Sequence, residues 1–165
     1  RRFCGSYAEG CWVRMSTTSV AAAFKDAFYA WAVTNWSGDP VQVQFGIPGP
    51  NQQDDIVGFL DVTAEQDSAT FGTQRSREEV LTLVVTASSY RAGESAQEKV
   101  AWDRAVALIA ELEQYARVTD TTIGGTVREC FLTNLQIAGT PQELIAGGRL
   151  VEAQATFTAH ARIRS

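Results

Sequence analysis

Apolar and polar residues alternate without a break over the last part of the chain. The apolar set is Val151, Ala153, Ala155, Phe157, Ala159, Ala161 and Ile163, and the polar set is Glu152, Gln154, Thr156, Thr158, His160, Arg162 and Arg164. Successive side chains of a strand point to opposite faces, so this period predicts one long strand with one buried face. The polar face must then meet water or another subunit.

Two other segments carry apolar residues at the spacing of a helix. In 19–35 the stripe consists of Val20, Phe24, Ala27, Phe28 and Trp31. After Arg91, a longer seam consists of Ala101, Ala105, Leu108, Leu112 and Tyr115. Both patterns predict amphipathic helices that bury one face. Ser95 and Glu98 fit a capping box at the start of the second helix.

Further segments have the two-residue period of strands. The period appears in 41–47, 56–63, 69–73, 78–90 and a segment that begins near Val127. AEQDS, at 64–68, reads as a polar turn between two of them. In 78–90 the residues that face one way are Leu81, Leu83, Val85 and Ala87, and in the segment after the second helix the alternate set is Val127, Glu129, Phe131, Thr133, Leu135 and Ile137.

The order of these elements is α-β-β-β-β-α-β-β, which predicts an α+β fold: a largely antiparallel sheet with the two main helices packed on one face. The chain has 165 residues, 45% of them hydrophobic, enough for one domain with a real core. We expect that domain to span 15–165. Residues 1–14 precede the only methionine, Met15, and we expect them to be an N-terminal extension, either non-native or from an upstream start.

The double glycine in TDTTIGGTVREC, Gly124 and Gly125, raises the question of a phosphate-binding loop. Such a loop follows a strand and opens a helix, so that amide groups at the helix N-terminus point at the anion. Here the expected helix comes first and the strand second. The pair is therefore predicted to be a turn from helix to strand.

Candidate chemistry is sparse. The formal net charge of −5 gives no overall attraction for nucleic acid or an anionic membrane. The only histidine, His160, has no nominated acid or nucleophile beside it, and Cys130 is expected to be a small packing residue. Asp54, Asp55 and Asp61 are more typical of solubility than of a metal site, with magnesium as the open alternative. We expect no catalytic residue, no metal and no cofactor.

Arginines gather toward the last strand. They are Arg149, Arg162 and Arg164, and Arg128 joins them if the last two strands pair. Together with Glu152, Gln154 and His160 they are our candidates for a subunit or partner interface, because arginines on a regular strand can pair with the acids of a neighbouring subunit or meet DNA backbone. The alternative is a solvated edge.

The order of several motifs from Met15 to Ser165 resembles that of the tail terminator proteins of siphophages. These motifs are LTLVVTASSYRAG, a helix of the form A-x-x-R-A-V-A-L-I-A-E-L-E, then TTIGGTVREC and a final ARIR strand. The resemblance implies a non-catalytic subunit that forms a six-fold ring on the end of the tail tube, stops its polymerisation and gives the head a docking surface. It also implies a location in the neck of the virion, after synthesis in the host cytoplasm.

The partners that the resemblance implies are other copies of the chain, the tail tube protein and a head-closure or connector protein. Genomic DNA would pass through the lumen without sequence-specific binding, and no membrane is involved. Three other functions stay open: a head-closure or connector protein of the same neck region, a small-ligand-binding or enzymatic α+β domain, and an interaction module unrelated to phage. A ligand-binding domain would predict a closed apolar pocket.

Overall fold

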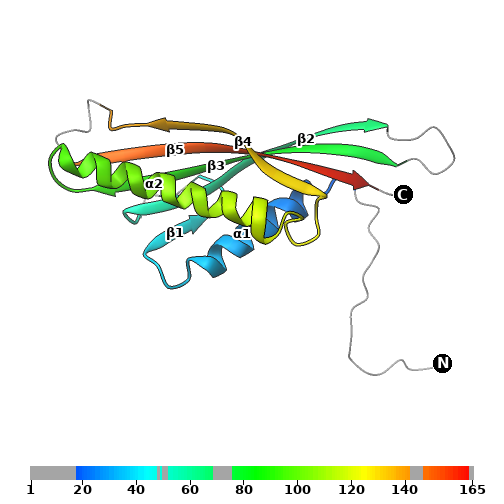
Figure 1. The fold of residues 1–165 in the computed structure, drawn as a ribbon, viewed down its shortest axis with the longest axis horizontal. Coiled ribbons are helices and arrows are strands. Elements are labelled where there is room, and N and C mark those ends of the chain that lie inside the picture. Colours follow the sequence, from blue (N-terminus) through cyan, green and yellow to red (C-terminus); the bar gives the residue numbers. More distant parts are fainter. Residues whose placement is uncertain (1–17, 48, 50–51, 69–75, 142–146, 164–165) are drawn as a thin grey trace, which may run out of the picture.

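The computed structural model describes residues 18–47, 49, 52–68, 76–141 and 147–163 (Figure 1). Its elements are α1 (Ala21–Asn35), β1 (Val41–Gln44), β2 (Asp55–Ser68), β3 (Arg77–Arg91), α2 (Ala96–Gln114), the π-helical turn η1 (Tyr115–Thr119), β4 (Glu129–Ala138) and β5 (Arg149–Ile163). The order of helices and strands confirms the expected α+β class. The expected strand at 69–73 and the expected extension at 1–14 lie outside the described residues.

The strands form one sheet in the order β1-β2-β3-β5-β4. The short β1 is parallel to β2, and every other neighbouring pair is antiparallel. At its centre, β3 and β5 pair along their whole length, from Arg77 opposite Ile163 to Arg91 opposite Arg149. This confirms the largely antiparallel sheet.

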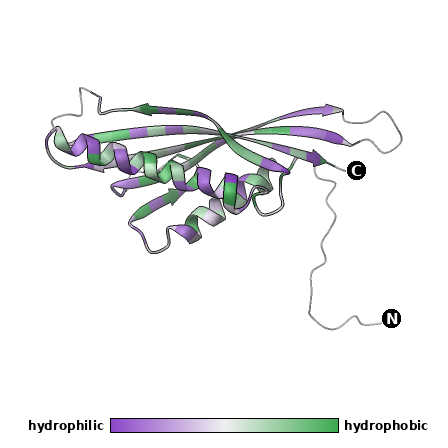
Figure 2. Cartoon of the chain, in the orientation of Figure 1, coloured by the Kyte–Doolittle hydropathy of each residue, from purple (hydrophilic) through white to green (hydrophobic). Residues whose placement is uncertain are grey.

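Both helices lie on the same side of the sheet (Figure 1). The alternate residues of β3 and β5 that face them are fully buried, among them Leu81, Leu83, Val85, Ala155 and Phe157. Green and purple alternate along these strands in Figure 2, as expected for strands with one apolar face. Among the described residues, no helix covers the opposite side of the sheet (Figure 1).

Phe28 of α1 is the hub of the core. Its ring centroid lies 5.1 Å from that of Phe157, 5.6 Å from Tyr115, 5.7 Å from Phe59 and 6.0 Å from Phe24. Tilted and edge-to-face contacts at these distances are favourable for aromatic rings. One helical residue thus joins α1 to β2, β5 and the end of α2.

The seam predicted for the second helix is confirmed, since all of its members are buried: Ala101, Ala105, Leu108, Leu112 and Tyr115. The expected capping box is wrong, because Ser95 makes no side-chain hydrogen bond to the helix. The Glu98 carboxylate instead accepts a hydrogen bond from the backbone N–H of Thr140, at 3.2 Å. Glu98 therefore ties the start of α2 to the segment after β4.

The polar residues 64–68 are not a turn. They continue β2 and pair with β3, from Ala64 opposite Leu81 to Ser68 opposite Arg77. Their polar character has another cause: Ala64, Glu65, Gln66 and Asp67 are exposed, because this end of the hairpin extends beyond the helices (Figure 1). A strand segment that no helix covers needs no apolar face, so its sequence lacks the alternation by which a strand is predicted.

The single alternating face predicted for 127–137 is also wrong. A bulge between Leu132 and Asn134 shifts the register of β4 against β5. Before the bulge the residues that face the helices are Cys130 and Leu132, and after it Ile137 faces them. Phe131, on the opposite face from Cys130, is 39% exposed. Packing of Cys130 in the core is confirmed.

Gly124 and Gly125 turn the chain from η1 toward β4, as predicted. Their φ angles are 67° and 75°, in the left-handed region that glycine adopts without strain. The Asp120 carboxylate holds this turn by accepting hydrogen bonds from the backbone N–H groups of Thr122, at 3.0 Å, and Gly124, at 2.6 Å. Of the helices in the described residues, none is long and apolar enough to cross a membrane.

Candidate functional site: the open face of the sheet

We call the sheet surface opposite the helices the open face. It is formed by Thr82, Val84, Thr86 and Ser88 of β3, by Glu152, Gln154, Thr156, Thr158, His160 and Arg162 of β5, and by Phe131, Asn134 and Gln136 of β4. These side chains are half-buried or exposed. In the part of the chain that the structure describes, no helix packs over them (Figure 1).

The centre of the open face is uncharged and rich in hydroxyl groups. Thr158 lies between Thr82 of β3 and Phe131 of β4, and Thr156 lies between Val84 and Asn134. The Thr133 hydroxyl is 3.0 Å from the Thr158 hydroxyl and donates a hydrogen bond to the Thr156 carbonyl, also at 3.0 Å. Strand pairing thus places small polar and β-branched groups side by side at this centre.

One end of the open face brings together three of the predicted interface residues. Arg128 and Arg162 both approach the Glu78 carboxylate, at 3.5 and 3.6 Å. The backbone N–H of Arg128 donates to the carbonyl of His160 at 2.7 Å, and the His160 ring stacks on Phe131 with centroids 6.0 Å apart. Arg128 and Arg162 also border a hollow beside the double-glycine turn.

The remaining candidates lie elsewhere. Glu152 and Gln154 share the open face but are toward the opposite end of β5. Arg149 lies at that far end and, by the two-residue period, on the helix side with Val151, so it does not join Arg162. Arg164 lies outside the described residues. The interface role of all seven residues stays a prediction.

The side chains to consider for catalysis are Cys130, which is buried on the helix side of the sheet, and His160, which lies on the open face. Burial raises the pKa of the Cys130 thiol to about 12, so it stays protonated at neutral pH and is no nucleophile. His160 has Glu129 directly across on β4, but its own ring is stacked on Phe131. Among the described residues, no group of three or more His, Cys, Asp or Glu side chains could hold a metal ion.

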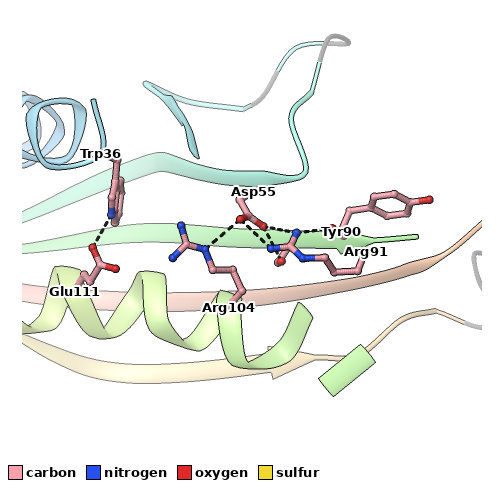
Figure 3. Close-up of polar contacts among 7 residues, drawn as sticks. Trp36, Asp55, Tyr90, Arg91, Arg104 and Glu111 are labelled. Atoms are coloured by element: carbon pink, nitrogen blue, oxygen red, sulfur yellow. Dashed lines mark hydrogen bonds and ion pairs between the residues drawn. The ribbon is translucent and has the colours of Figure 1, made fainter. Parts of the chain in front are cut away.

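A buried ion network, which the sequence reading missed, joins three elements on the helix side (Figure 3). The Asp55 carboxylate accepts hydrogen bonds from Arg91, at 2.8 and 3.0 Å, from Arg104 at 3.1 Å and from Ser89 at 2.8 Å. Burial alone would raise the pKa of Asp55, but these hydrogen bonds outweigh it and hold the pKa below its ordinary value. Every lone-pair direction is used within the chain, so the network is structural.

The expectation that Asp55 serves solubility is therefore wrong. The sequence does carry a signal for it: Asp55 has the same parity as Val57 and Phe59, which face the core. A separate link joins the end of α1 to α2: the Trp36 indole N–H donates to Glu111 at 2.6 Å (Figure 3). The Asp55 network fixes α2 on the sheet, and the bond from Trp36 ties the end of α1 to α2.

Comparison with known proteins gives no family. The chain matches no protein-family model and no curated protein sequence. It is similar to a chain of a solved structure described as the "Virion of native gene transfer agent (GTA) particle", with a TM-score of 0.49 and 14% identity, over 90% of this chain and 100% of that one. At these values the similarity does not establish what this chain does.

Proposed function

We propose that this chain is a structural protein of a phage virion, located in the neck. In this proposal several copies form a ring on the end of the tail tube, stop its polymerisation and provide the surface on which the head docks. The resemblance of the motifs from Met15 to Ser165 to siphophage tail terminators supplies the family. The ring of six copies and the tail tube and connector partners come from that resemblance.

The observation that carries the proposal is the open face. Among the described residues, helices cover the five strands on one side only. The other side is mostly polar over β4 and β5, with a hollow at each end, one beside Arg128 and Arg162 and one lined by Thr86, Ser88 and Glu152. Ligand-binding and catalytic sites are concave and gather a few convergent polar groups. A broad uncovered face instead suits contact with another protein surface, as assembly requires.

Charge also fits this role. The formal net charge of −5 disfavours retention of DNA, whose phosphates bind through lysine and arginine. Two described arginines lie at one end of the open face, Arg162 on it and Arg128 beside it, and both approach Glu78. A ring of such subunits would let DNA pass through its lumen without holding it.

Electron microscopy of lysates tests the proposal, with this gene alone disrupted in its source phage. We expect overlong tail tubes beside unattached heads, because tube growth would have lost its stop. Supplying the intact gene in trans should restore tails of normal length. Normal tails beside heads that have lost their DNA would instead indicate head closure, and intact infectious virions would overturn the neck assignment.

A further inference from the structure

The described sheet has unpaired strand edges on both of its sides. β4 is the last strand on one side. On the other, β1 pairs only with Asp55–Gly58, so the rest of β2 has no strand partner on its outer edge within the described residues. Unpaired N–H and C=O groups along such edges are templates for pairing with another chain.

The edge formed by β4 has only part of the usual protection. Monomeric proteins guard edge strands with charges, prolines, bulges or very short strands, and of these β4 has a bulge after Leu132. β4 runs from Glu129 to Ala138, and after Glu129 its sequence CFLTNLQIA contains no charge and no proline. Phe131 and Leu135 are each 39% exposed on it. On either side of this bulge, the described residues pair β4 only with β5.

The open outer edge of β2 is shorter than β4 and has the opposite character. Lys25 Nζ donates to the Leu60 carbonyl at 2.6 Å, which leaves Val62–Ser68 as the open stretch. Glu65 and Asp67 are exposed along it, and Asp61 is exposed directly before it. Such charges discourage pairing between two copies of β2, whereas β4 carries no charge after Glu129.

Strand directions in the sheet decide how the two edges can meet. β2 and β5 run one way, and β3 and β4 run the other. If copies follow one another around a ring with the strands along its axis, β4 of one copy meets β2 of the next in antiparallel orientation. A closed ring requires such a head-to-tail contact between two different surfaces of the subunit.

The registers also place a possible ion pair at this contact. Glu129 is opposite His160, His160 opposite Val80, and Val80 opposite Glu65. Arg128, next to Glu129, therefore lies at the level of the acidic end of β2. Its side chain is 65% exposed, and its contact with Glu78 is a long 3.5 Å. It can turn to a carboxylate of the adjacent copy.

We propose that β4 of one copy pairs with the Val62–Ser68 edge of β2 in the next, so that the sheet continues from subunit to subunit. This inference deepens the proposed function and rests on it for the closed ring. A symmetric β4–β4 pair would use one edge only and stop at a dimer, leaving both β2 edges open.

Photo-cross-linking of the purified full chain tests the contact. A benzophenone amino acid is placed at Phe131 on β4, which the registers put at the level of Thr63. The control position is Val100 on α2, which is 48% exposed. Irradiation of the concentrated protein should give a covalent dimer from position 131 whose linked peptide maps within 60–68. The Val100 variant should give roughly tenfold less, because no strand pairing holds α2 against another copy.

A link from position 131 to β4 or to a helix of the other copy would overturn the proposal. A dimer yield no higher than that of the control would do the same. The assay uses only the isolated chain, so its failure is separate from that of the proposed function, which gene disruption tests. If the cross-link forms but gene disruption gives normal tails, the role at the end of the tube is wrong while the contact between β4 and β2 remains supported.

Discussion

Arg91 and Asp55 form a two-pronged ion pair, with Nη1 and Nη2 of the arginine 2.8 and 3.0 Å from the two carboxylate oxygens. The Asp55 side chain is only 6% exposed, and Arg104 of α2 makes a third contact. Strand β2, strand β3 and helix α2 therefore share one buried carboxylate, and the position of α2 on the sheet depends on it.

Replacing that carboxylate should destabilise the fold. Asp55→Asn leaves Arg91 and Arg104 without their charged acceptor, and we expect a loss of about 2–3 kcal/mol in the free energy of unfolding. Urea denaturation measures it. Asp54→Asn, at the exposed neighbouring position, is the control and should change stability by less than about 0.5 kcal/mol. Equal effects at both positions would contradict the role of the network.

The same pair predicts a pH dependence. The pKa of Asp55 is lower in the folded chain than its ordinary value near 3.8. Its contribution is therefore complete above that value and is lost as the pH falls through the lower, folded pKa. Glu79 has a lowered pKa as well, because the hydrogen bonds of Ser19, Gln66 and Val20 outweigh its burial. Acid titration of stability should show a smaller loss for Asp55→Asn than for the natural chain.

The double-glycine turn should show a purely conformational cost. A Cβ at Gly125 would meet no atom within 4 Å, yet φ there is +75°. Gly125→Ala should therefore cost about 1 kcal/mol through backbone strain alone. Gly38→Ala is the matched control, since a Cβ there also meets nothing within 4 Å and its φ is not positive. Thermal unfolding should separate the two, and equal stabilities would exclude strain at this turn.

A bulky residue in the centre of the open face tests its use in assembly. Thr156 lies between Val84 and Asn134. We expect Thr156→Tyr to change the free energy of unfolding by less than about 0.5 kcal/mol. In the gene-disrupted phage, its complementation should fall by roughly tenfold or more, as for a residue worth about 1.4 kcal/mol at an interface. Val100→Tyr on α2 should complement normally. Full complementation by Thr156→Tyr would argue against docking on this face.

Hydrophobic periodicity was enough to predict the buried residues of an element when one of its faces is buried along its whole length. The alternation of β5 and the seam of α2 predicted their buried residues correctly, because the helix layer and the sheet enforce a regular period there. At 64–67 both faces are exposed, so no alternation marks the strand there. In β4 the bulge after Leu132 inverts the period, and alternation alone carries no sign of it.

The site was harder to predict than the fold. Arg128 and Arg162 meet at Glu78 only because β4 and β5 pair in one register, which pairwise spacing in the sequence does not fix. Arg149 is on the same strand as Arg162, but it lies at the other end of β5 and on the opposite face, so it does not join Arg162 and Arg128. Asp55 shares the inward parity of its strand, but its two arginine partners come from distant segments.

Cryo-electron microscopy of finished particles from the source phage tests the central claim most directly. The account predicts a ring of copies of this chain at the head-proximal end of the tail tube, with the sheets of neighbouring copies in contact. Density for the chain elsewhere in the particle, or particles that lack it altogether, would contradict the account.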